Sequence, residues 1–450
     1  MPRFRNTNFF TLFQTGTSFH SAPSFTLVEL LIAIAISAFG GPAGGGLPLR
    51  RKSTPSFTLV ELLIVIAILA VLAAAVVIVL NPAELLAQAR DSQRITDMKT
   101  LKDSIDIWVV DNPSTAMGTS QTVYVSLPDT SLTCANITSL PSLPSGWQYH
   151  CVTEANLQNT DGTGWLPLNL SSIYGGSPIP YLPIDPSNEA SSGKYYTYTS
   201  GGSYELTALM EAEKENASVA DGGSLPGVYE LGTHIGLTPP TRDKGLVGYW
   251  TFDEGSGTTA YDSSGKGNDG VWSGPSIHYA TGKTGPYSAI FNESESNYVD
   301  CPPNDSLDFR DTFSLSFWIK GSVGTSNWPH FISKRDGENY IGWQTQIYGQ
   351  GPDIYLRIDT SAMTNQTSGV LTVLDETWHH AVFVINNGSK EYYLDGVKRH
   401  SGSFSVGGGM IAHSTPLHFG GRMIVQLDDV RLFNRSLSQK EVSAIYEGTK

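Results

Sequence analysis

Glu61 is the only charged residue in an apolar run that covers residues 57–80. A carboxylate in the hydrocarbon core of a membrane costs at least about 2.5–3.5 kcal/mol unless it finds a partner, so such a residue is functional by default. A run of about 20 apolar residues can span the roughly 30 Å core as a helix. Arg50, Arg51 and Lys52 precede the run and predict that its N-terminal side faces the cytoplasm. The sequence therefore predicts a single-pass membrane helix with a functional acid near its start.

The string SFTLVELL at residues 56–63 resembles the signal of type IV prepilins and type II secretion pseudopilins. The resemblance implies that a prepilin peptidase cleaves between Ser56 and Phe57, and that Phe57 is then N-methylated. It also implies that Glu61 pairs with the N-terminus of a neighbouring subunit during assembly. Ser56 stands where Gly is commoner in that family, so cleavage is expected to be slow. The alternative is an ordinary signal anchor that carries a Glu.

A second copy of this signal lies upstream. Residues 21–37 match residues 53–69 at 14 of 17 positions. The first copy breaks at the Gly/Pro-rich stretch 40–46, so its apolar run is too short to span a bilayer. We therefore interpret the second copy as the working signal and residues 1–56 as a leader with a truncated duplicate.

Length and composition suggest several extracellular domains. A chain of 450 residues is long enough for two or three domains, and its 16% charged residues with 46 Gly and 25 Pro suit β-rich exported folds. The net charge is −14; removing residues 1–56 takes away five basic residues and Glu29, which leaves 23 basic and 41 acidic residues, or −18. An acidic chain is a poor partner for nucleic acid, whose binding depends on basic patches. It favours cation binding and solubility.

Three cysteines lie in the exported part of the chain. Cys134 and Cys151 are 17 positions apart in a Pro/Ser/Gly-rich stretch, the kind of loop that a disulfide closes in an oxidising compartment. Two buried free thiols are the alternative. Cys301 is left over and is interpreted as a small buried apolar residue.

The chain after the apolar run continues as an amphipathic helix and a small head. One apolar stripe repeats every three or four positions and comprises Ile95, Met98, Leu101, Ile105 and Trp108. Asn81-Pro82 predicts a bend, and Asp111-Asn112-Pro113 predicts the end of the helix. We therefore expect one long helix over 57–110 and a head over 111–236.

The head should be small and contain β-strands. The string LPIDP at 182–186 and the Tyr-rich segments at 194–198 and 203–206, around Gly201-Gly202, predict loops and two short strands. This layout resembles the major pseudopilin of type II secretion over about residues 57–235, which implies an α+β head with a calcium-binding loop. Residues 211–223 are acidic enough for that loop, but their spacing departs from the family pattern. A solvated loop without an ion is therefore expected here.

A different domain follows a short Pro-rich linker at 237–244. From residue 245 the chain consists of short β-branched and aromatic runs, of which 315–320, 354–358, 381–385 and 391–394 are clear strand candidates. Asn387-Gly388 and Asp395-Gly396 are hairpin-turn dipeptides. Many short strands at this spacing predict an all-β sandwich over 245–450.

Four strings give this sandwich a family resemblance: GLVGYWTFDE at 245–254, DSSGKGNDG at 262–270, WHHAVFVINNGSKEYYLDGV at 378–397 and LDDVRLFNRSL at 427–437. Together they resemble the laminin-G-like, concanavalin-A-like jelly roll over 245–447. The resemblance implies a module that binds carbohydrate or protein, often with one calcium ion. The same resemblance makes Trp378, His379 and His380 core or turn-supporting residues without chemistry.

Calcium is the one metal that the sequence raises for this sandwich. Calcium needs several hard oxygen ligands, and the strings above contain Asp253, Asp262, Asn268 and Asp428 where such ligands would lie. The alternative is that these residues cap turns and bind backbone amides. No other cofactor is expected.

Catalysis is not expected. Glycoside hydrolases on this fold need two carboxylates about 5–9.5 Å apart across the sugar, and their Glu-x-Asp-x-x-Glu arrangement is missing from the sequence. Serine-hydrolase, zinc-protease and phosphate-loop motifs are missing as well. We therefore expect a non-enzyme, although the fold alone decides no function.

Together these patterns predict a multidomain protein. It has a long N-terminal transmembrane α-helix, a small α+β pilin head and an all-β concanavalin-A-like jelly-roll sandwich. The hypothesis is a processed pilin or pseudopilin subunit that leaves the bacterial inner membrane for the cell surface or an extracellular filament. Its expected partners are the prepilin peptidase, other subunits and a glycan or protein ligand. The alternatives are a membrane-anchored surface protein that does not assemble and a surface polysaccharide hydrolase.

Overall fold

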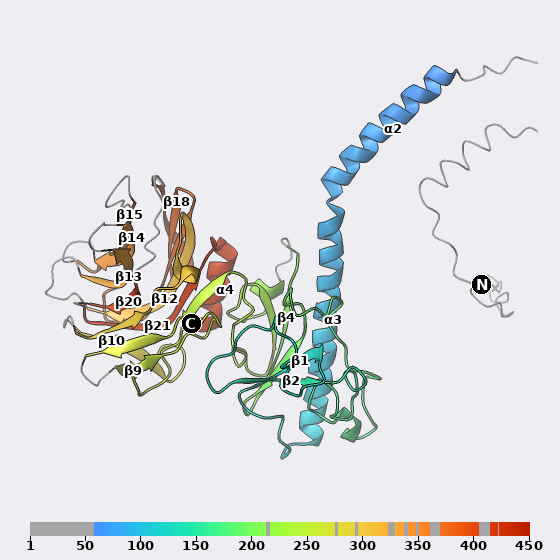
Figure 1. The fold of residues 1–450 in the computed structure, drawn as a ribbon, viewed down its shortest axis with the longest axis horizontal. Helices are drawn as coiled ribbons and strands as arrows, with labels where there is room; N and C mark the ends of the chain where they lie inside the picture. Colours follow the sequence, from blue (N-terminus) through green and yellow to red (C-terminus); the bar gives the residue numbers. More distant parts are fainter. Residues whose placement is uncertain are drawn as a thin grey trace, which may run out of the picture. The chain divides into compact units, whose positions relative to one another are not determined.

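The structure is a computed structural model. It describes residues 58–450 except 213–216, 275–277, 293–295, 323–328, 337–340, 348–350, 361–369, 405–414 and 422, and it describes only the backbone of 73–80. The processing residues Ser56 and Phe57 lie outside the described residues. The chain divides into two compact units, residues 1–74 and residues 75–450, and each is described by itself. Elements carry the labels of Figure 1.

Helix α2 (Leu59–Leu80) begins with a reciprocal cap. The backbone N–H of Thr58 donates to Glu61 Oε2 at 2.8 Å, and the backbone N–H of Glu61 donates to Thr58 Oγ1 at 3.3 Å. This is a capping box, in which a Thr and a Glu three residues later satisfy two otherwise unpaired donors. Taken over the residues that the structure describes, none of the helices has the length and apolarity that a membrane crossing requires.

Helix α3 (Pro82–Asp111) carries the head. Asn81 precedes it with a left-handed φ of 39°, and Pro82 lacks the amide hydrogen that would continue the helical ladder. The single helix expected over 57–110 is therefore two helices, with Pro82 in the first turn of the second, where it is best tolerated. The predicted apolar stripe is confirmed, because Met98, Leu101, Ile105 and Trp108 are buried and Ile95 packs against the same core.

The head contains a five-stranded sheet in the order β2-β1-β3-β4-β5. Tyr196, Tyr198 and Tyr204 are fully buried between this sheet and α3, and the hydroxyl of Tyr196 donates to Asp97 of α3 at 2.8 Å. The hairpin of β3 and β4 corresponds to the two strands expected from the Tyr-rich segments. The strands are β1 (Thr122–Pro128), β2 (Gln148–Val152), β3 (Thr197–Ser200), β4 (Tyr204–Leu209) and β5 (Val228–Gly232).

Residues 237–244, which were expected to be a linker, are packed on the head. Thr238 donates its backbone N–H to Glu205 Oε2 at 2.6 Å and its hydroxyl to Thr199 Oγ1 at 2.9 Å. The guanidinium of Arg242 donates to the Tyr195 carbonyl at 2.6 Å. At the other end of the segment, Nε of Arg435 in the sandwich donates to the Lys244 carbonyl at 2.6 Å. The segment is therefore bonded both to the head and to the sandwich.

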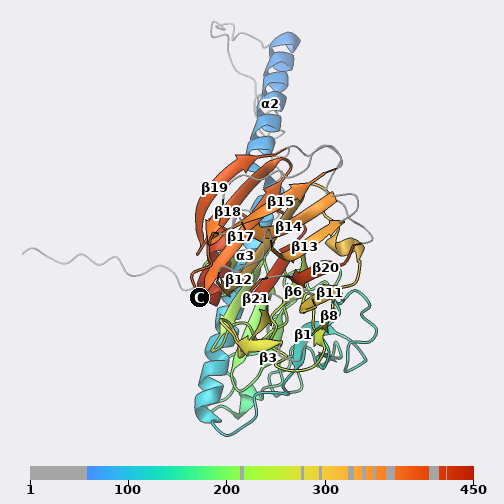
Figure 2. The ribbon, with the colours of Figure 1, turned by 90° about the vertical axis from the view of Figure 1, so that its left-hand side faces the viewer.

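The sandwich consists of two eight-stranded sheets. One has the order β19-β18-β17-β12-β21-β10-β9, with β6 paired to β21, and the other has the order β16-β15-β14-β13-β20-β11-β8-β7. Figures 1 and 2 show the sheets as two layers, and the largest apolar core of the chain fills the space between them. The expected jelly-roll sandwich is thus present.

The predicted strands and turns lie where the sequence placed them. The four expected strand segments fall within β12, β15, β17 and β18. The dipeptides Asn387-Gly388 and Asp395-Gly396 have positive φ at both positions, as the tight hairpin turns before β18 and β19 require. The strands are β6 (Leu246–Trp250), β7 (Thr259–Ala260), β8 (Gly270–Ser273), β9 (Tyr279–Thr281), β10 (Tyr287–Phe291), β11 (Tyr298–Cys301), β12 (Thr312–Gly321), β13 (His330–Asp336), β14 (Ile341–Ile347), β15 (Asp353–Asp359), β16 (Leu371–Thr372), β17 (His379–Asn386), β18 (Ser389–Leu394), β19 (Val397–Ser403), β20 (Leu417–Gly420) and β21 (Val425–Phe433).

Helix α4 (Gln439–Thr449) follows strand β21 of the sandwich. Ser438 caps it with Glu441 in a second capping box, and Val442, Ala444 and Ile445 are buried. Beside it, the guanidinium of Arg431 in β21 donates to the carbonyl of Ser224 in the head at 2.6 Å. A buried ion pair with Asp429, at 3.1 Å, holds that guanidinium in place.

Candidate functional site

Glu61 has a partner within its own helix. Besides the backbone bonds of the cap, the Thr58 hydroxyl donates to Glu61 Oε2 at 2.9 Å. The carboxylate of Glu61 is therefore bonded to Thr58 at the start of α2. The signal for this cap, a Thr three positions before a Glu, was readable in the sequence but was not used.

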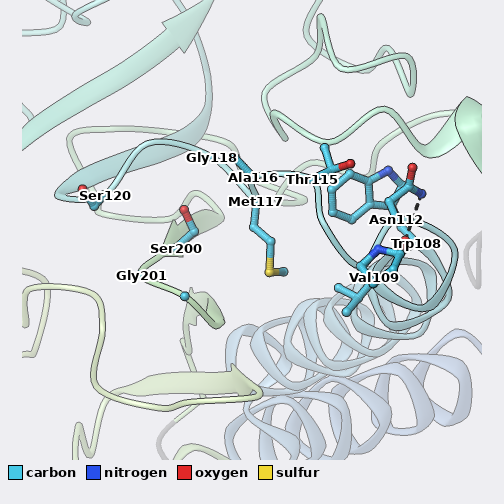
Figure 3. A pocket seen from close by; sticks show the side chains of 12 residues that line it. Trp108, Val109, Asn112, Thr115, Ala116, Met117, Gly118, Ser120, Ser200 and Gly201 are labelled. Atoms are coloured by element: carbon cyan, nitrogen blue, oxygen red, sulfur yellow. Dashed lines mark hydrogen bonds between the residues drawn. The ribbon is translucent and has the colours of Figure 1, made fainter.

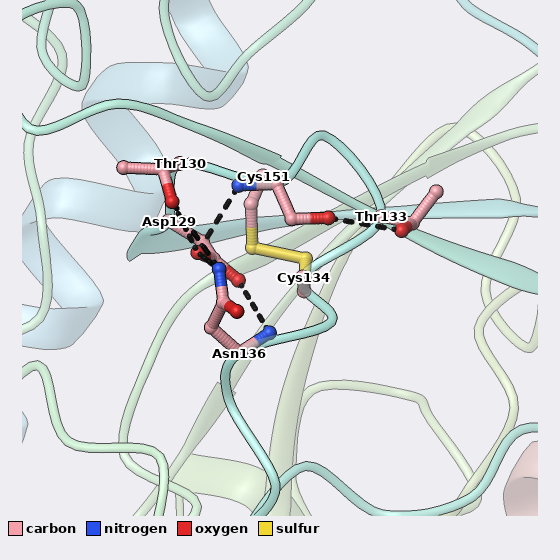
Figure 4. The surroundings of a disulfide bond; sticks show 7 residues. Asp129, Thr130, Thr133, Cys134, Asn136 and Cys151 are labelled. Carbon is pink, nitrogen blue, oxygen red and sulfur yellow. Dashed lines mark hydrogen bonds between the residues drawn. A yellow bond between two sulfur atoms is a disulfide. The ribbon is translucent and has the colours of Figure 1, made fainter.

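The disulfide between Cys134 and Cys151 is present, as predicted, with Cα atoms 5.3 Å apart (Figure 4). The Asp129 carboxylate organises the loop that leads to Cys134, because it accepts the backbone N–H groups of Ser131 at 3.1 Å and of Asn136 at 3.0 Å. Both cysteines belong to a small apolar core that is separate from the main core of the head. Cys301 is unpaired and buried in the sandwich, as expected.

Loss of the disulfide is expected to destabilise the head. Replacing Cys134 and Cys151 together by Ser should lower the free energy of unfolding by about 3 kcal/mol, the chain-entropy value for a loop of this length. Chemical denaturation of the oxidised wild type and of the double variant measures the difference.

Cys134 and Cys151 are buried, so Ser at these positions also buries two hydroxyl groups. The control is therefore wild type kept reduced, which loses the disulfide without any substitution and should show the loss that is due to the bond alone. Thiol titration of denatured, unreduced protein should find one reactive thiol. Three reactive thiols would contradict the assignment.

The candidate calcium residues separate into two groups. Asp262 and Asn268 lie together: Asp262 accepts the backbone N–H groups of Tyr249, Ser264 and Asn268, each at 2.9 Å, and Asn268 Nδ2 donates to the Val247 carbonyl at 2.7 Å. These two residues fix a turn against β6. Asp262 and Asn268 therefore cap a turn and bind backbone groups, which is the alternative to calcium binding that the sequence left open.

Asp253 and Asp428 form the second group. Asp428 accepts the backbone N–H groups of Lys283 at 2.6 Å and Thr284 at 2.9 Å, and Asp253 accepts that of Tyr287 at 3.0 Å. Burial raises the pKa of Asp428 to about 7 and that of Asp253 to about 6. The charges of Asp429 and Asp253 add to the increase at Asp428, and those of Glu254 and Asp429 add to the increase at Asp253. Among the described residues, no group of three or more His, Cys, Asp or Glu side chains is arranged to hold a metal ion.

The histidines of the WHH string have structural roles. The ring of His379 lies between two carboxylates, with Nδ1 2.9 Å from Asp395 and Nε2 3.2 Å from Asp375. His380 is buried beside Ser316, whose hydroxyl is 2.8 Å from Nε2, and burial lowers the pKa of His380 to about 3. His380 is therefore a neutral core residue.

The head contains an ion-pair network that sequence reasoning missed. The buried guanidinium of Arg94 in α3 donates to Asp185 at 2.6 and 2.8 Å and to Asp91 at 2.7 Å, and it lies 2.6 Å from Glu211. Asp91 in turn accepts the backbone N–H groups of Glu211 and Ala212. The network ties α3 to two loops. Glu211 belongs to the acidic loop that was compared with a calcium loop, and its carboxylate is occupied by cations of the chain itself.

A second buried group in the head consists of three acids. Glu205 accepts the backbone N–H groups of Gly236 and Thr238, Glu230 accepts that of Leu225 at 2.9 Å, and Asp221 accepts that of Glu230 at 2.7 Å. Burial raises the pKa of all three carboxyls, that of Asp221 to about 7, and proximity to Glu205 and Asp221 adds to the increase at Glu230.

The three acids make head stability dependent on pH. A carboxyl whose pKa is raised on folding binds more protons in the native state, so its contribution to the unfolding free energy is present at low pH and is lost as pH rises through the native pKa. Between about pH 4 and 8 this part of the head should therefore become less stable. Glu230→Gln keeps one acceptor and removes the charge, so we expect it to stabilise the head at pH 8 and to weaken the dependence of its stability on pH.

Hydrogen exchange of the β4 and β5 amides at pH 5 and pH 8, corrected for intrinsic rates, measures the effect. Glu154→Gln removes an exposed charge from the same head and serves as the control, with no change expected at either pH. Faster exchange in Glu230→Gln than in wild type at pH 8 would contradict the prediction.

A cavity of about 440 Å³ opens at the C-terminal end of α3, between Trp108 and the β3–β4 turn (Figure 3). Met117 and Ser200 line it, and the buried indole N–H of Trp108 has no acceptor among the described residues. The described lining contains no ionisable side chain. This cavity could hold a small neutral group, but its described lining has no carboxylate, imidazole or amine that could act as a general acid or base.

Family models match the two ends of this architecture. The prokaryotic N-terminal methylation motif matches residues 52–77, which contain Ser56, Phe57 and Glu61. The concanavalin A-like lectin/glucanases superfamily matches residues 293–443, within the sandwich. The resemblances drawn from the sequence are thus confirmed over these ranges.

Individual relatives are similar to the sandwich. Adhesion G-protein coupled receptor V1 of Danio rerio is 23% identical over 146 residues, which is 30% of this chain and 2% of the receptor. Domain 4 of AbnA, a GH43 extracellular arabinanase from Geobacillus stearothermophilus solved with arabinotriose, is 20% identical with a TM-score of 0.37 and covers 45% of this chain and 98% of that domain. The binding domain of Paraclostridial Mosquitocidal Protein 1 is 16% identical with a TM-score of 0.36, over 45% of this chain and 52% of its own. This chain therefore spans only a small part of the curated receptor and about half of the mosquitocidal binding domain.

Proposed function

We propose that this chain is a subunit of a type IV pilus or pseudopilus that is processed by a prepilin peptidase and displays a carbohydrate- or protein-binding sandwich at the cell surface. The observation that carries the proposal is the presence, in one chain, of the methylation motif at 52–77 and the lectin-like domain at 293–443. The motif implies processing and assembly partners. The lectin-like domain implies a ligand.

The membrane step rests on the sequence of residues 57–80. Their apolar run, preceded by Arg50, Arg51 and Lys52, supports a single span in the bacterial inner membrane with a cytoplasmic N-terminus before cleavage. Cleavage between Ser56 and Phe57 would release the leader and leave two charges in the run, the new N-terminal amine of Phe57 and the carboxylate of Glu61. The subunit would then enter a filament or remain at the cell surface.

A minor or tip subunit fits the size of the exported part better than the main building block. A sandwich of about 200 residues follows the head, and it would crowd a helical lattice if every subunit carried one. The rival is a surface protein that uses the helix only as an anchor.

Binding is favoured over hydrolysis of a polysaccharide. Asp253, Asp262 and Asp428 each accept a backbone N–H group within the chain. These bonds support a role for the three carboxylates in fixing turns, and not as the paired acids of a glycoside hydrolase. We do not propose a calcium ion at these carboxylates. Calcium requires six to eight oxygen ligands, whereas these oxygens accept backbone N–H groups of the chain. The ligand class is a surface glycan or an extracellular protein, and no nucleic acid is expected for a chain of this charge.

Mass spectrometry of the mature N-terminus tests the processing step. The chain purified from membranes should begin with N-methylated Phe57. A chain that begins at Phe25, or that keeps Arg50–Lys52, would contradict it. The matched test is Ser56→Gly, which restores the commoner residue and should speed cleavage, whereas the control Ser53→Gly should leave the rate unchanged.

Immunogold labelling tests display, with an antibody against residues 245–447. Label along or at the tip of filaments supports the proposal, and label confined to the cell envelope favours the anchor. The full chain in neutral detergent is then applied to a glycan array and to matrix proteins, with polysaccharide release assayed in parallel. Release of reducing sugar would overturn the assignment as a non-enzyme.

A further inference from the structure

A second cavity, of about 660 Å³, lies beside the first turns of α3. Asn81, Ala87 and Arg90 line one side of it, and Lys194 and residues 242–244 contribute Arg242 and Lys244 on the other. All of these residues belong to the unit of residues 75–450. From Asn81 to Arg90 the helix rises about 14 Å, at 1.5 Å per residue. The cavity therefore begins at the residue that directly follows the apolar run 57–80.

Four basic residues line the cavity, and two of them are compensated. Glu211, which also lines it, is 2.6 Å from Arg90 and 2.9 Å from Lys194, and it lies 2.6 Å from the buried Arg94 as well. One carboxylate thus has three cations around it. The charge of Glu211 is fully used inside the protein and does not oppose a negatively charged ligand.

Arg242 and Lys244 are the other two cations. The hydrogen-bond acceptors around the Arg242 guanidinium are all uncharged. The Arg242 guanidinium donates to the carbonyls of Tyr195 at 2.6 Å and Gly193 at 3.3 Å and to the Thr197 hydroxyl at 3.2 Å, and it lies 4.6 Å from the centre of the Tyr195 ring. The Lys244 side chain is exposed. Among the described residues, neither side chain forms an ion pair with a carboxylate.

Glu84 also lines the cavity and accepts a hydrogen bond from Gln88 at 3.3 Å, so the lining contains four basic and two acidic side chains. An excess of two positive charges at one cavity is unusual in a chain whose mature net charge is −18. Arg242 is held rigidly by its neutral acceptors, so little conformational freedom is lost when an anion approaches it. Lys244 is a mobile point charge that can follow the anion. Asn81 adds an amide to the same lining.

We propose that this cavity binds a phosphodiester group, such as the headgroup of an anionic phospholipid carries. The inference rests on the proposed function in one respect, which is that residues 57–80 lie in the membrane. The headgroup layer occupies about 5–8 Å on each side of the hydrocarbon core, and the lining of the cavity starts at the first residue beyond the apolar run. A phosphodiester carries one negative charge and two free oxygens, which matches the charge of Lys244 and the field of Arg242.

The test compares lipids bound to the full chain in a neutral detergent. Phosphatidylglycerol and phosphatidylcholine are added in equal amounts, and the lipid retained is counted by native mass spectrometry. Wild type should retain at least fivefold more phosphatidylglycerol, since one basic residue near an anionic surface is worth about that factor. Lys244→Glu should abolish the preference. Lys99→Glu changes the charge by the same amount at an exposed position of α3 outside the cavity and should retain it.

Soluble probes distinguish the source of the phosphodiester. Glycerophosphoglycerol, which is the same headgroup without acyl chains, is added to wild type and Lys244→Glu, and the melting temperature is measured. A rise in wild type alone supports the site with a soluble source, and a rise in neither, together with the lipid preference, supports a membrane source. Equal retention of the two lipids by wild type, or unchanged preference in Lys244→Glu, would overturn the proposal.

The same experiment separates this inference from the proposed function. If the chain purifies without detergent, the membrane helix is wrong, but the soluble probe still tests the cavity. If the chain requires detergent and the lipid preference does not depend on Lys244, the membrane helix stands and the cavity assignment fails. Circular dichroism of Lys244→Glu establishes that the variant folds, as expected for an exposed side chain.

Discussion

Arg94→Met is expected to destabilise the head by about 3–5 kcal/mol, the usual cost of removing one partner of a buried ion pair. The variant fills a similar volume but leaves Asp91 and Asp185 buried without their cation. Both carboxylates still accept backbone N–H groups, so the loss measures the unpaired charge and not a broken turn. Thermal and urea unfolding of the full chain, followed by hydrogen exchange of α3, measure it.

Arg90→Met is the matched control for this substitution. Arg90 lies one turn earlier on α3 and binds the same Glu211, but its side chain is 37% exposed, whereas that of Arg94 is fully buried. Exposed ion pairs contribute about 0–1 kcal/mol, so the control should lose no more than that. Equal losses in the two variants would show that the network contributes through Glu211 alone and would contradict the prediction.

Glu61→Gln is expected to reduce incorporation into filaments more than tenfold, while membrane insertion is unchanged or improved. Gln can keep the acceptor of the capping box, so the start of α2 is preserved. It cannot provide the negative charge that pairs with the N-terminal amine of a neighbouring subunit in a medium of low dielectric constant. A tenfold loss corresponds to about 1.4 kcal/mol per subunit.

Thr58→Val separates the cap from the charge. It removes the hydroxyl that donates to Glu61 at 2.9 Å and should cost about 1 kcal/mol of helix stability, yet the carboxylate remains for a neighbour. Sedimented filaments, probed by immunoblot beside the membrane fraction, should contain Thr58→Val but not Glu61→Gln. Normal incorporation of Glu61→Gln would favour the anchored, non-assembling protein.

Local patterns in the sequence were sufficient for most of the elements. The stripe from Ile95 to Trp108, the Tyr-rich hairpin and the two Asx-Gly turns are set by residues close in sequence, and they lie where they were expected. The cysteine pair was also predictable, because its loop is short. The break at Asn81 was expected as a bend, but the left-handed φ of Asn81 separates two helices.

Contacts over long sequence distances could not be predicted in the same way. Asp185 reaches Arg94 across 91 residues, and nothing near either residue indicates the partner. The candidate calcium residues were chosen by type and spacing, but the backbone N–H groups that occupy Asp428 come from residues more than 140 positions earlier. The packing of residues 237–244 on the head could not be predicted, because a Pro-rich composition is equally compatible with a free linker and with a segment bonded to a domain.

The docking of residues 237–244 affects how several subunits could bind one ligand together. A free linker would let each sandwich sample a large volume, and its effective concentration at a second ligand site would fall steeply with linker length. Here Thr238 and Arg242 are bonded to the head and Lys244 to Arg435 of the sandwich, so each sandwich has only a short tether. Subunits at regular intervals would then offer their sites at regular intervals. A repetitive ligand such as a polysaccharide or a fibrous protein would be held by avidity, even where a single site is weak.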